Sequence, residues 1–269
     1  MASAATLLLS FTLPITASYA QGQGASLSSA TASQSVTQAS ESVVKAFAPS
    51  GTLRASINLG NPVLARREAD GELGGVSTAL ARALAARLGI GLELMPFDGA
   101  GKVVDAAGRD VWDLAFLARD PLRAEQIGFT APYVTIEGVY AVRAASDLHS
   151  LADVDRPGVR VCVGRGAAYD LHLTRTLKHA EIERCDTSKR ALEDFAAGVG
   201  NAAAGISQAV TAFAAAHTGL RVIAEPFMRI HQAMAVPRAR AVVVPYLDVF
   251  LAEMAASGFI DRALDRNDI

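Results

Sequence analysis

Arg123 is the side chain of this sequence best placed to bind a small anion. It follows a short apolar run at residues 113–117, typical of a buried parallel strand, and a sharp turn at Asp120 and Pro121. Asp120 can accept the first free amides of a helix, and Pro121 suits the first helical position because its missing N–H is not needed there. The dipole of that helix disfavours a cation in its first turn unless an anion joins it. We therefore expect Arg123 to bind a carboxylate, with a surface ion pair to Asp120 or Glu125 as the alternative.

Two further features could contact a ligand. Glu137 is the one acidic residue of the apolar stretch 135–142, where it either pairs with an arginine at a hinge or faces a cleft. A glycine turn at residues 164–166 follows a predicted strand at 159–163 and precedes a predicted helix at 168–178. Such a turn leaves free amides that point at an anion. No Lys-Ser/Thr follows it, which argues against a phosphate-binding loop.

Motifs for metal or nucleophilic chemistry are lacking in the sequence. The two cysteines, Cys162 and Cys185, are too few for a structural zinc site, and the five histidines form no ligand pattern. No Gly-x-Ser-x-Gly elbow is present. No cofactor or metal is therefore expected. The cysteines fall on neighbouring predicted strands, which seldom offer disulfide geometry when they are parallel, so we expect two buried thiols.

Length and charge set wider limits. A chain of 269 residues can bury a large core and form two lobes or domains. The net charge is −2 and there is no basic run, which argues against nucleic acid as a partner.

The N-terminal segment indicates export. Residues 7–15 form a short apolar run, and the small residues Ser18 and Ala20 fit a signal peptide over 1–20 with cleavage after Ala20, although no Lys or Arg precedes the run. No cysteine lies near the cleavage position, so a lipoprotein anchor is not indicated. Residues 21–50 are rich in Ser, Ala, Gln and Thr and read as a flexible linker. Residues 40–47 could form a short helix within it, and folded structure should begin near Gly51.

The elements that must position Arg123 begin with a strand, a turn, a helix and a second strand. Residues 53–59 predict the first strand, Asp70-Gly71 predicts a hairpin-like turn, and residues 76–88 have helical periodicity. Gly89 ends that helix, and residues 91–96 predict the next strand. This order is typical of an α/β fold.

The region around Arg123 resembles a known family. Residues 120–133 read Asp-Pro-Leu-Arg-Ala-Glu-Gln-Ile-Gly-Phe-Thr-Ala-Pro-Tyr, similar to the Thr-Pro-Glu-Arg-…-Phe-Ser/Thr-x-Pro-Tyr signature of the amino-acid-binding family of solute-binding proteins. These are receptors of ABC importers with the type II periplasmic-binding-protein fold, two α/β lobes of mostly parallel sheet flanked by helices around a cleft. The resemblance covers residues 51–266. It implies a first lobe at 51–142 and 228–266 and a second lobe at 143–227.

In that family the signature arginine clamps the carboxylate of the ligand, and the resemblance gives this role to Arg123. The other ligand-binding residues that we predict come from the first lobe, the crossing segment and the second lobe. They are Asn61, Ala118, Asp120, Glu137, Gly166, Ala167, Ala168, Ser207 and Gln208.

The sequence departs from the family pattern where an ammonium group would bind. The aspartate that binds it in the family corresponds to Ile206, and Ala167 and Ala168 replace hydroxyl residues. Burying an ammonium group without a counter-charge costs several kcal/mol. We therefore expect a simple organic acid to bind more tightly than the amino acid of the same skeleton, unless Glu137 replaces the lost aspartate.

These observations predict a monomeric receptor in the periplasm. It binds a small carboxylate-bearing molecule, an amino acid or an organic acid, by lobe closure and then docks on the permease subunits of an ABC importer. The alternative is a periplasmic enzyme similar to the cyclohexadienyl dehydratases, which look similar in fold. Such an enzyme needs a general acid or base in the cleft, and only Glu137 and Asp120 are candidates.

Overall fold

The computed structural model describes residues 40–265 of the chain. The predicted signal peptide and residues 21–39 of the predicted linker lie outside this range. Within it, helices flank two main β-sheets, so the predicted α/β class is confirmed.

The first half of the described chain holds most of the elements near Arg123. In order they are α1 (Glu41–Phe47), β1 (Thr52–Asn58), β2 (Arg66–Arg67), β3 (Leu73–Gly74), α2 (Val76–Leu88), β4 (Gly91–Phe97), α3 (Ala100–Asp105), the 3₁₀ helix η1 (Ala107–Arg109), β5 (Ala115–Ala118) and the 3₁₀ helix η2 (Arg123–Glu125).

The second half begins and ends with its longest strands. In order the elements are β6 (Ile127–Arg143), α4 (Leu151–Val154), β7 (Arg160–Gly164), α5 (Ala168–Thr176), β8 (Glu181–Cys185), α6 (Ser188–Ala196), β9 (Ala202–Ile206), α7 (Ser207–Ala216), β10 (Leu220–Pro237), the 3₁₀ helix η3 (Arg238–Val243), α8 (Val244–Ala256) and α9 (Phe259–Asp265).

Helix α2 shows how local sequence determines an element. Its buried residues recur every three or four positions, which gives the helix one apolar face. It ends at Gly89, whose φ of 68° lies in the left-handed region that glycine adopts without strain. The predicted helix 76–88 is therefore confirmed, as are the strands on either side of it and the hairpin of β2 and β3.

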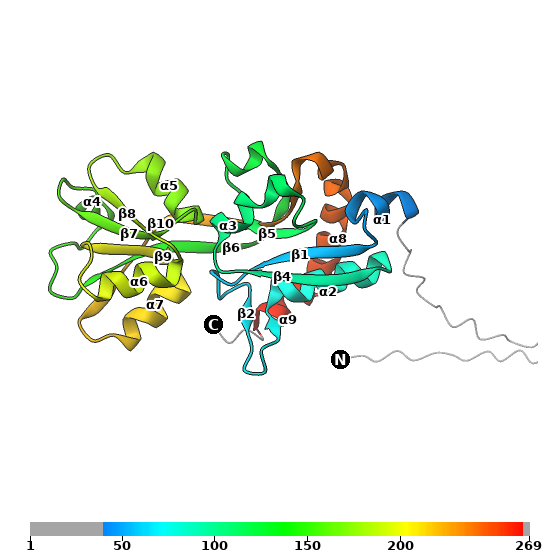
Figure 1. Cartoon of the computed structure of the whole chain (residues 1–269). Coiled ribbons are helices and arrows are strands. Elements are labelled where there is room, and N and C mark those ends of the chain that lie inside the picture. The colour runs from blue at the N-terminus through cyan, green and yellow to red at the C-terminus, as the bar shows by residue number, and fades with distance from the viewer. Residues whose placement is uncertain (1–39, 266–269) are drawn as a thin grey trace, which may run out of the picture. The chain divides into compact units, whose positions relative to one another are not determined.

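Two long antiparallel strands connect the sheets. β1 and β4 are parallel, and the other main sheet has the order β5-β10-β6-β9-β7-β8. β6 and β10 pair along most of their length, and Figure 1 shows them running side by side from β5 to β9. We call the part built on β1, β4 and β5 the first lobe and the part built on β7, β8 and β9 the second lobe. The predicted lobe boundaries at residues 142/143 and 227/228 stay a prediction.

The central motif folds differently from the prediction. β5 is fully buried, as expected, but it pairs antiparallel with β10, while only Leu114 forms a parallel bridge, to Ala55. The predicted helix after Pro121 is a single 3₁₀ turn, and β6 begins at Ile127. The reason is the sequence after the turn, Ile-Gly-Phe-Thr-Ala-Pro-Tyr-Val, which is rich in β-branched and aromatic residues and contains a proline and a glycine that weaken a helix.

Packed structure begins earlier than predicted. The short helix expected at 40–47 is confirmed as α1, and the Ser40 side chain accepts a hydrogen bond from the amide of Val43. Phe47 is fully buried and its ring contacts that of Tyr246 edge to face, with centroids 5.6 Å apart. The predicted start near Gly51 is therefore corrected to Ser40, because Phe47 supplies the apolar anchor that a flexible linker lacks.

Alternate residues of the second-lobe strands bury two different faces. Val161 and Val163 of β7 belong to the core that includes Leu173 of α5, whereas Cys162 packs in the separate cluster that includes Phe195 of α6. Figure 1 accordingly shows α5 on one face of this part of the sheet and α6 and α7 on the other. The helices on both faces explain why these strands read as continuous apolar runs.

Cys162 and Cys185 are both free and buried, as predicted. They lie on adjacent parallel strands, but Cys162 is opposite Glu183 and Cys185 is opposite Gly164, so the two thiols are out of register. Burial raises the pKa of the Cys162 thiol to about 11 and that of the Cys185 thiol to about 12.

No single helix among residues 40–265 is long and apolar enough to cross a membrane. One bent pair of segments, Arg238–Ala256 with Phe259–Asp265, reaches that length and composition when the two are taken together.

Asp113 anchors the first lobe through two arginines. Its side chain is fully buried, and its carboxylate accepts hydrogen bonds from the Arg54 amide at 2.8 Å and from the Arg54 side chain at 2.8 and 3.0 Å. Arg240, which follows β10, donates to the same carboxylate. Burial alone raises the pKa of Asp113, but the hydrogen bonds from Arg54 and Arg240 outweigh it and hold the pKa below its usual range.

We predict that Asp113→Asn lowers the free energy of unfolding at pH 7 by about 3 kcal/mol, because it leaves two arginines without their buried partner. Asp110→Asn is the matched control. Asp110 contacts the same arginines, but its side chain is 72% exposed, so its loss should cost less than about 1 kcal/mol. Urea unfolding of the three proteins measures both differences.

The Asp113 effect should also depend on pH. Since the folded-state pKa is lowered, the stabilisation is present above the unfolded pKa of about 3.9 and is lost as the pH falls through the folded value. The difference between wild type and Asp113→Asn should shrink below about pH 4. A difference that stays constant down to pH 3 contradicts this assignment.

Candidate functional site

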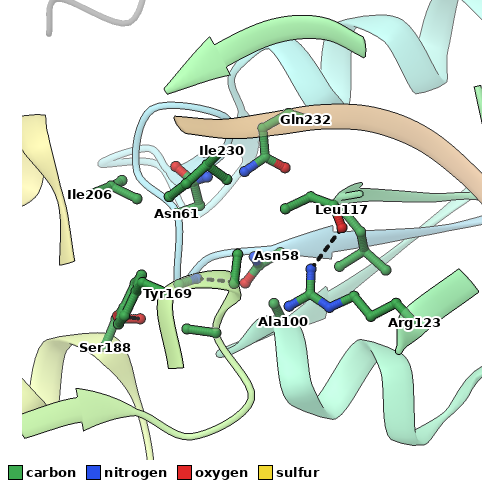
Figure 2. A pocket seen from close by; sticks show the side chains of 14 residues that line it. Asn58, Asn61, Ala100, Leu117, Arg123, Tyr169, Ser188, Ile206, Ile230 and Gln232 are labelled. Atoms are coloured by element: carbon green, nitrogen blue, oxygen red, sulfur yellow. Dashed lines mark hydrogen bonds between the residues drawn. The ribbon is translucent and has the colours of Figure 1, made fainter. Parts of the chain in front are cut away.

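A small cavity of about 40 Å³ lies between the lobes, with Arg123 in its wall. The first lobe supplies half of the lining, the second lobe contributes the starts of α5 and α6 and the end of β9, and Ile230 and Gln232 come from β10 (Figure 2). The lining residues are Asn58, Gly60, Asn61, Ala100, Leu117, Ala118, Arg123, Ala167, Ala168, Tyr169, Ser188, Ile206, Ile230 and Gln232.

Arg123 is a buried cation whose hydrogen bonds, among residues 40–265, all go to backbone carbonyl groups. The residue is 2% exposed, its Nη1 donates to the Ala118 carbonyl at 3.0 Å, and its Nη2 donates to the Gly166 carbonyl at 2.8 Å. The Nε atom is buried without a hydrogen-bond partner among the described residues. Burial lowers the pKa of Arg123 to about 10 although the charge of Asp120 acts to raise it, so the guanidinium stays charged at neutral pH.

Asp120 shapes the turn that presents Arg123 but does not pair with it. Its Oδ1 accepts from the Leu122 amide at 2.9 Å, so the predicted role of Asp120 in the turn is confirmed. Its Oδ2 accepts from Arg175 of α5 at 2.7 Å. Asp120 is absent from the cavity lining, so its predicted place beside the ligand is not where the structure puts it. The alternative of an ion pair between Arg123 and Asp120 or Glu125 is likewise not seen among the described residues.

The glycine turn brings the second lobe against the first. Gly166 has a φ of 69°, and a Cβ there would lie 2.7 Å from the Cα of Gly101 in α3. Real Cβ atoms do not approach a backbone atom so closely, so both the conformation and the contact require glycine at Gly166. This close approach places the Gly166 carbonyl within reach of Arg123.

The amides predicted at this turn are mostly in use. The Gly166 amide donates to Asp170 Oδ2 at 2.8 Å, and the Ala167 amide donates to the Gly164 carbonyl at 3.1 Å. The expectation that both would face a ligand is therefore corrected. Ala168 begins α5, and the first amides of a helix have no acceptor within it. The prediction that the Ala168 amide binds a ligand therefore stays a prediction.

Several neutral polar side chains of the cavity were missed from the sequence. Gln232 is 5% exposed, and Tyr169 donates to Ser188 Oγ at 2.7 Å. Asn58 accepts from the Gly60 amide at 3.0 Å. A signal existed for Gln232, which interrupts an otherwise apolar strand end. Asn61, which was predicted, is 6% exposed and its Oδ1 has no partner among the described residues.

Three predicted residues lie elsewhere. Glu137, Ser207 and Gln208 line a separate surface cavity of about 430 Å³ together with Arg229 and His231. Glu137 is exposed on β6, opposite Arg229 of β10. The sequence could not reveal this, because a shift of one residue in a strand moves a side chain to the other face of the sheet.

The residues that line the Arg123 cavity therefore include a positive charge and no negative charge. No Asp or Glu is among them, and Ile206 occupies the position that holds an aspartate in the sequence pattern described above. Within residues 40–265, no group of three or more His, Cys, Asp and Glu side chains could hold a metal ion. The cavity offers one fixed positive charge and several neutral hydrogen-bonding groups, an arrangement that suits an anionic group.

The comparisons with known proteins agree with this architecture. The model of the bacterial extracellular solute-binding proteins, family 3, matches residues 53–267. No curated protein sequence matches the chain.

Solved structures of similar fold cover nearly the whole described chain. The cysteine-binding protein from Campylobacter jejuni has a TM-score of 0.73 at 18% identity, over 83% of this chain and 92% of its own. A candidate binding component of an ABC transporter from Wolinella succinogenes, complexed with lysine, has a TM-score of 0.70 at 20% identity, over 81% and 95%. An ancestral amino acid-binding protein, described as a precursor of cyclohexadienyl dehydratase, has a TM-score of 0.71 at 22% identity, over 83% of this chain and 98% of its own. At these identities the likeness shows the fold alone, and it confirms the predicted two-lobed architecture.

The burial of Arg123 predicts its effect on stability. We expect Arg123→Met to leave the ligand-free protein as stable as wild type or up to about 2 kcal/mol more stable, because it removes a buried charge that has no hydrogen-bonded acidic partner. Arg54→Met is the matched control, since it leaves the buried Asp113 with one arginine fewer and should destabilise. Urea unfolding of protein freed of ligand by denaturation and refolding measures both. Equal losses in the two variants contradict this account.

Proposed function

Because the chain belongs to the bacterial extracellular solute-binding proteins, family 3, we propose that it is an exported receptor that binds a small carboxylate-bearing molecule between its lobes. The observation that carries the proposal is the environment of Arg123, a buried guanidinium that makes no hydrogen bond to an acidic side chain in the described part of the chain. A ligand carboxylate supplies the missing negative charge. A guanidinium also matches a carboxylate in geometry, because its N–H groups form a planar fork.

The proposed ligand is an organic acid rather than an amino acid. An amino acid brings an ammonium group, and the cavity lining offers it only neutral acceptors such as Asn61 Oδ1. Glu137, which could have met the ammonium, lines the other cavity with Arg229. The neutral groups of Asn61, Gln232 and Tyr169 suit hydroxyl or carbonyl groups of a ligand instead.

A dehydratase activity is not favoured by the site. Such a reaction needs a general acid or base within reach of the substrate. The two candidates, Asp120 and Glu137, are both absent from the lining of the Arg123 cavity, and Asp120 is already paired with Arg175.

Delivery to an ABC importer completes the proposal. The family membership and the apolar N-terminal run support export to the periplasm, with cleavage after Ala20. On this proposal the ligand bridges the lobes and favours the closed state, and the closed monomer docks on the permease subunits.

Paired titrations test the ligand class. Wild-type protein is titrated by calorimetry with L-lactate against L-alanine and with L-phenyllactate against L-phenylalanine. We predict that each hydroxy acid binds more tightly, and that Ile206→Asp shifts the preference toward the amino acid because it supplies a counter-charge for the ammonium. Glu137→Gln is the control and should leave the preference unchanged. Tighter binding of the amino acids by wild type contradicts the organic-acid proposal and leaves the receptor proposal intact.

Substitution of Arg123 tests the receptor proposal itself. We predict that Arg123→Ala weakens binding of the tightest acid by about 2–4 kcal/mol, because a charge-assisted hydrogen-bonded pair loses one partner. Arg123→Lys should recover little of the loss, since an ammonium group cannot reproduce the planar fork. Calorimetry gives both values, and near-native affinity in Arg123→Ala rejects the assignment.

A further inference from the structure

A second, larger cavity adjoins the one that contains Arg123. Its volume is about 550 Å³, and the two cavities share Gly60 and Ser188 in their walls. It also lies between the lobes, with the end of β1 and the following loop on one side and α6 and α7 on the other. We call it the outer groove, and its lining residues are Leu59, Gly60, Pro62, Asp98, Thr187, Ser188, Lys189, Leu192, Ala209 and Phe213.

The polar members of the outer groove are committed to other partners. Asp98 pairs with Lys102 at 2.8 Å, and Lys189 pairs with Glu193 at 3.6 Å. Thr187 Oγ1 accepts from the Arg190 amide at 3.0 Å and so caps α6. These bonds lie within single elements or their immediate ends, so none of them crosses the groove.

Apart from Ser188, whose hydroxyl accepts from Tyr169 at 2.7 Å, the remaining side chains of the groove are apolar. Leu59 and Pro62 of the first lobe face Leu192 and Phe213 of the second across the shared cavity. Leu59, Pro62 and Phe213 are only partly buried. A surface of this kind gains free energy when an apolar group removes it from water.

The inner cavity is too small to hold much more than the anionic group of a ligand. Its volume of about 40 Å³ has room for a few water molecules at most. The larger outer groove, which meets this cavity at Gly60 and Ser188, offers room for the rest of a larger ligand.

We propose that the outer groove binds an apolar tail of the ligand, which makes the ligand an amphipathic monocarboxylic acid with an aliphatic or aromatic chain. This inference rests on the proposed function, in which Arg123 binds the carboxylate. It adds that the part of the ligand remote from the carboxylate is uncharged and apolar, because the charged side chains of the groove already have partners.

A homologous series of acids tests the inference. Wild-type protein is titrated by calorimetry with acetate, butanoate, hexanoate and octanoate, and with succinate as an acid that carries a second charge. Affinity should rise by about three- to fourfold for each added methylene group, as expected for burial of a CH₂ group. Succinate should bind more weakly than butanoate, because its second carboxylate enters the apolar groove.

A pair of variants locates the tail. Ala209 lines the groove on α7, and Ala212 lies exposed on the same helix outside it. Ala209→Leu narrows the groove and should weaken octanoate binding at least tenfold while changing butanoate binding little. Ala212→Leu is the matched control and should leave the whole series unchanged. Both substitutions keep a good helix former, so the fold should survive.

The outcomes separate the two proposals. If acids bind with Arg123-dependent affinity but octanoate binds no better than acetate, the outer groove does not hold a tail and the inference fails while the receptor proposal stands. If Ala209→Leu and Ala212→Leu change octanoate binding equally, the inference fails as well. If no carboxylate of the series and neither hydroxy acid binds, the proposed function fails and the inference fails with it.

Discussion

The charge of Arg123 is the constraint on which the rest of this structure depends. The buried charged residues of the described chain are Asp113, Asp120, Arg123 and Asp170. Each of the three aspartates has an arginine partner, Arg54 and Arg240 for Asp113, Arg175 for Asp120 and Arg184 for Asp170. Arg123 alone among the four makes no salt bridge to a charged side chain of the described chain. Because an isolated buried charge is costly, the fold stabilises this cation for a reason other than its own stability.

The surrounding elements hold Arg123 where it cannot escape to water. The turn before it is fixed by Asp120, whose pairing with Arg175 also ties the turn to α5 of the second lobe. The Ala118 carbonyl at the end of β5 accepts one guanidinium N–H, and the Gly166 carbonyl accepts another. In this arrangement of the lobes the guanidinium is already oriented, which lowers the cost of fixing it when a charge binds.

Local sequence was enough to predict most elements, and long-range geometry limited the rest. The helix ended by Gly89 and the hairpin at Asp70-Gly71 were predictable because their signals lie within a few residues. The residues near Arg123 were predictable as a candidate site from their similarity to a family signature. The sequence did not predict which cavity Glu137 and Gln232 face. That depends on the register of β6 against β10, which shifts more than once along their length. The single turn after Pro121 shows that the start signal at Asp120 and Pro121 does not set the length of a helix, because the residues that follow favour a strand.

The Gly166 carbonyl links charge neutralisation to the contact between the lobes. It accepts from Arg123 in the first lobe, and it can do so only because Gly101 and Gly166 lack side chains at their closest approach. Arg123 therefore lies at the point where the two lobes already touch. On the proposed function, a bound anion lowers the electrostatic cost of burying Arg123 in the closed state, whereas in an open state water would solvate the guanidinium. This difference in interaction energy between the two states is what a ligand needs in order to favour closure.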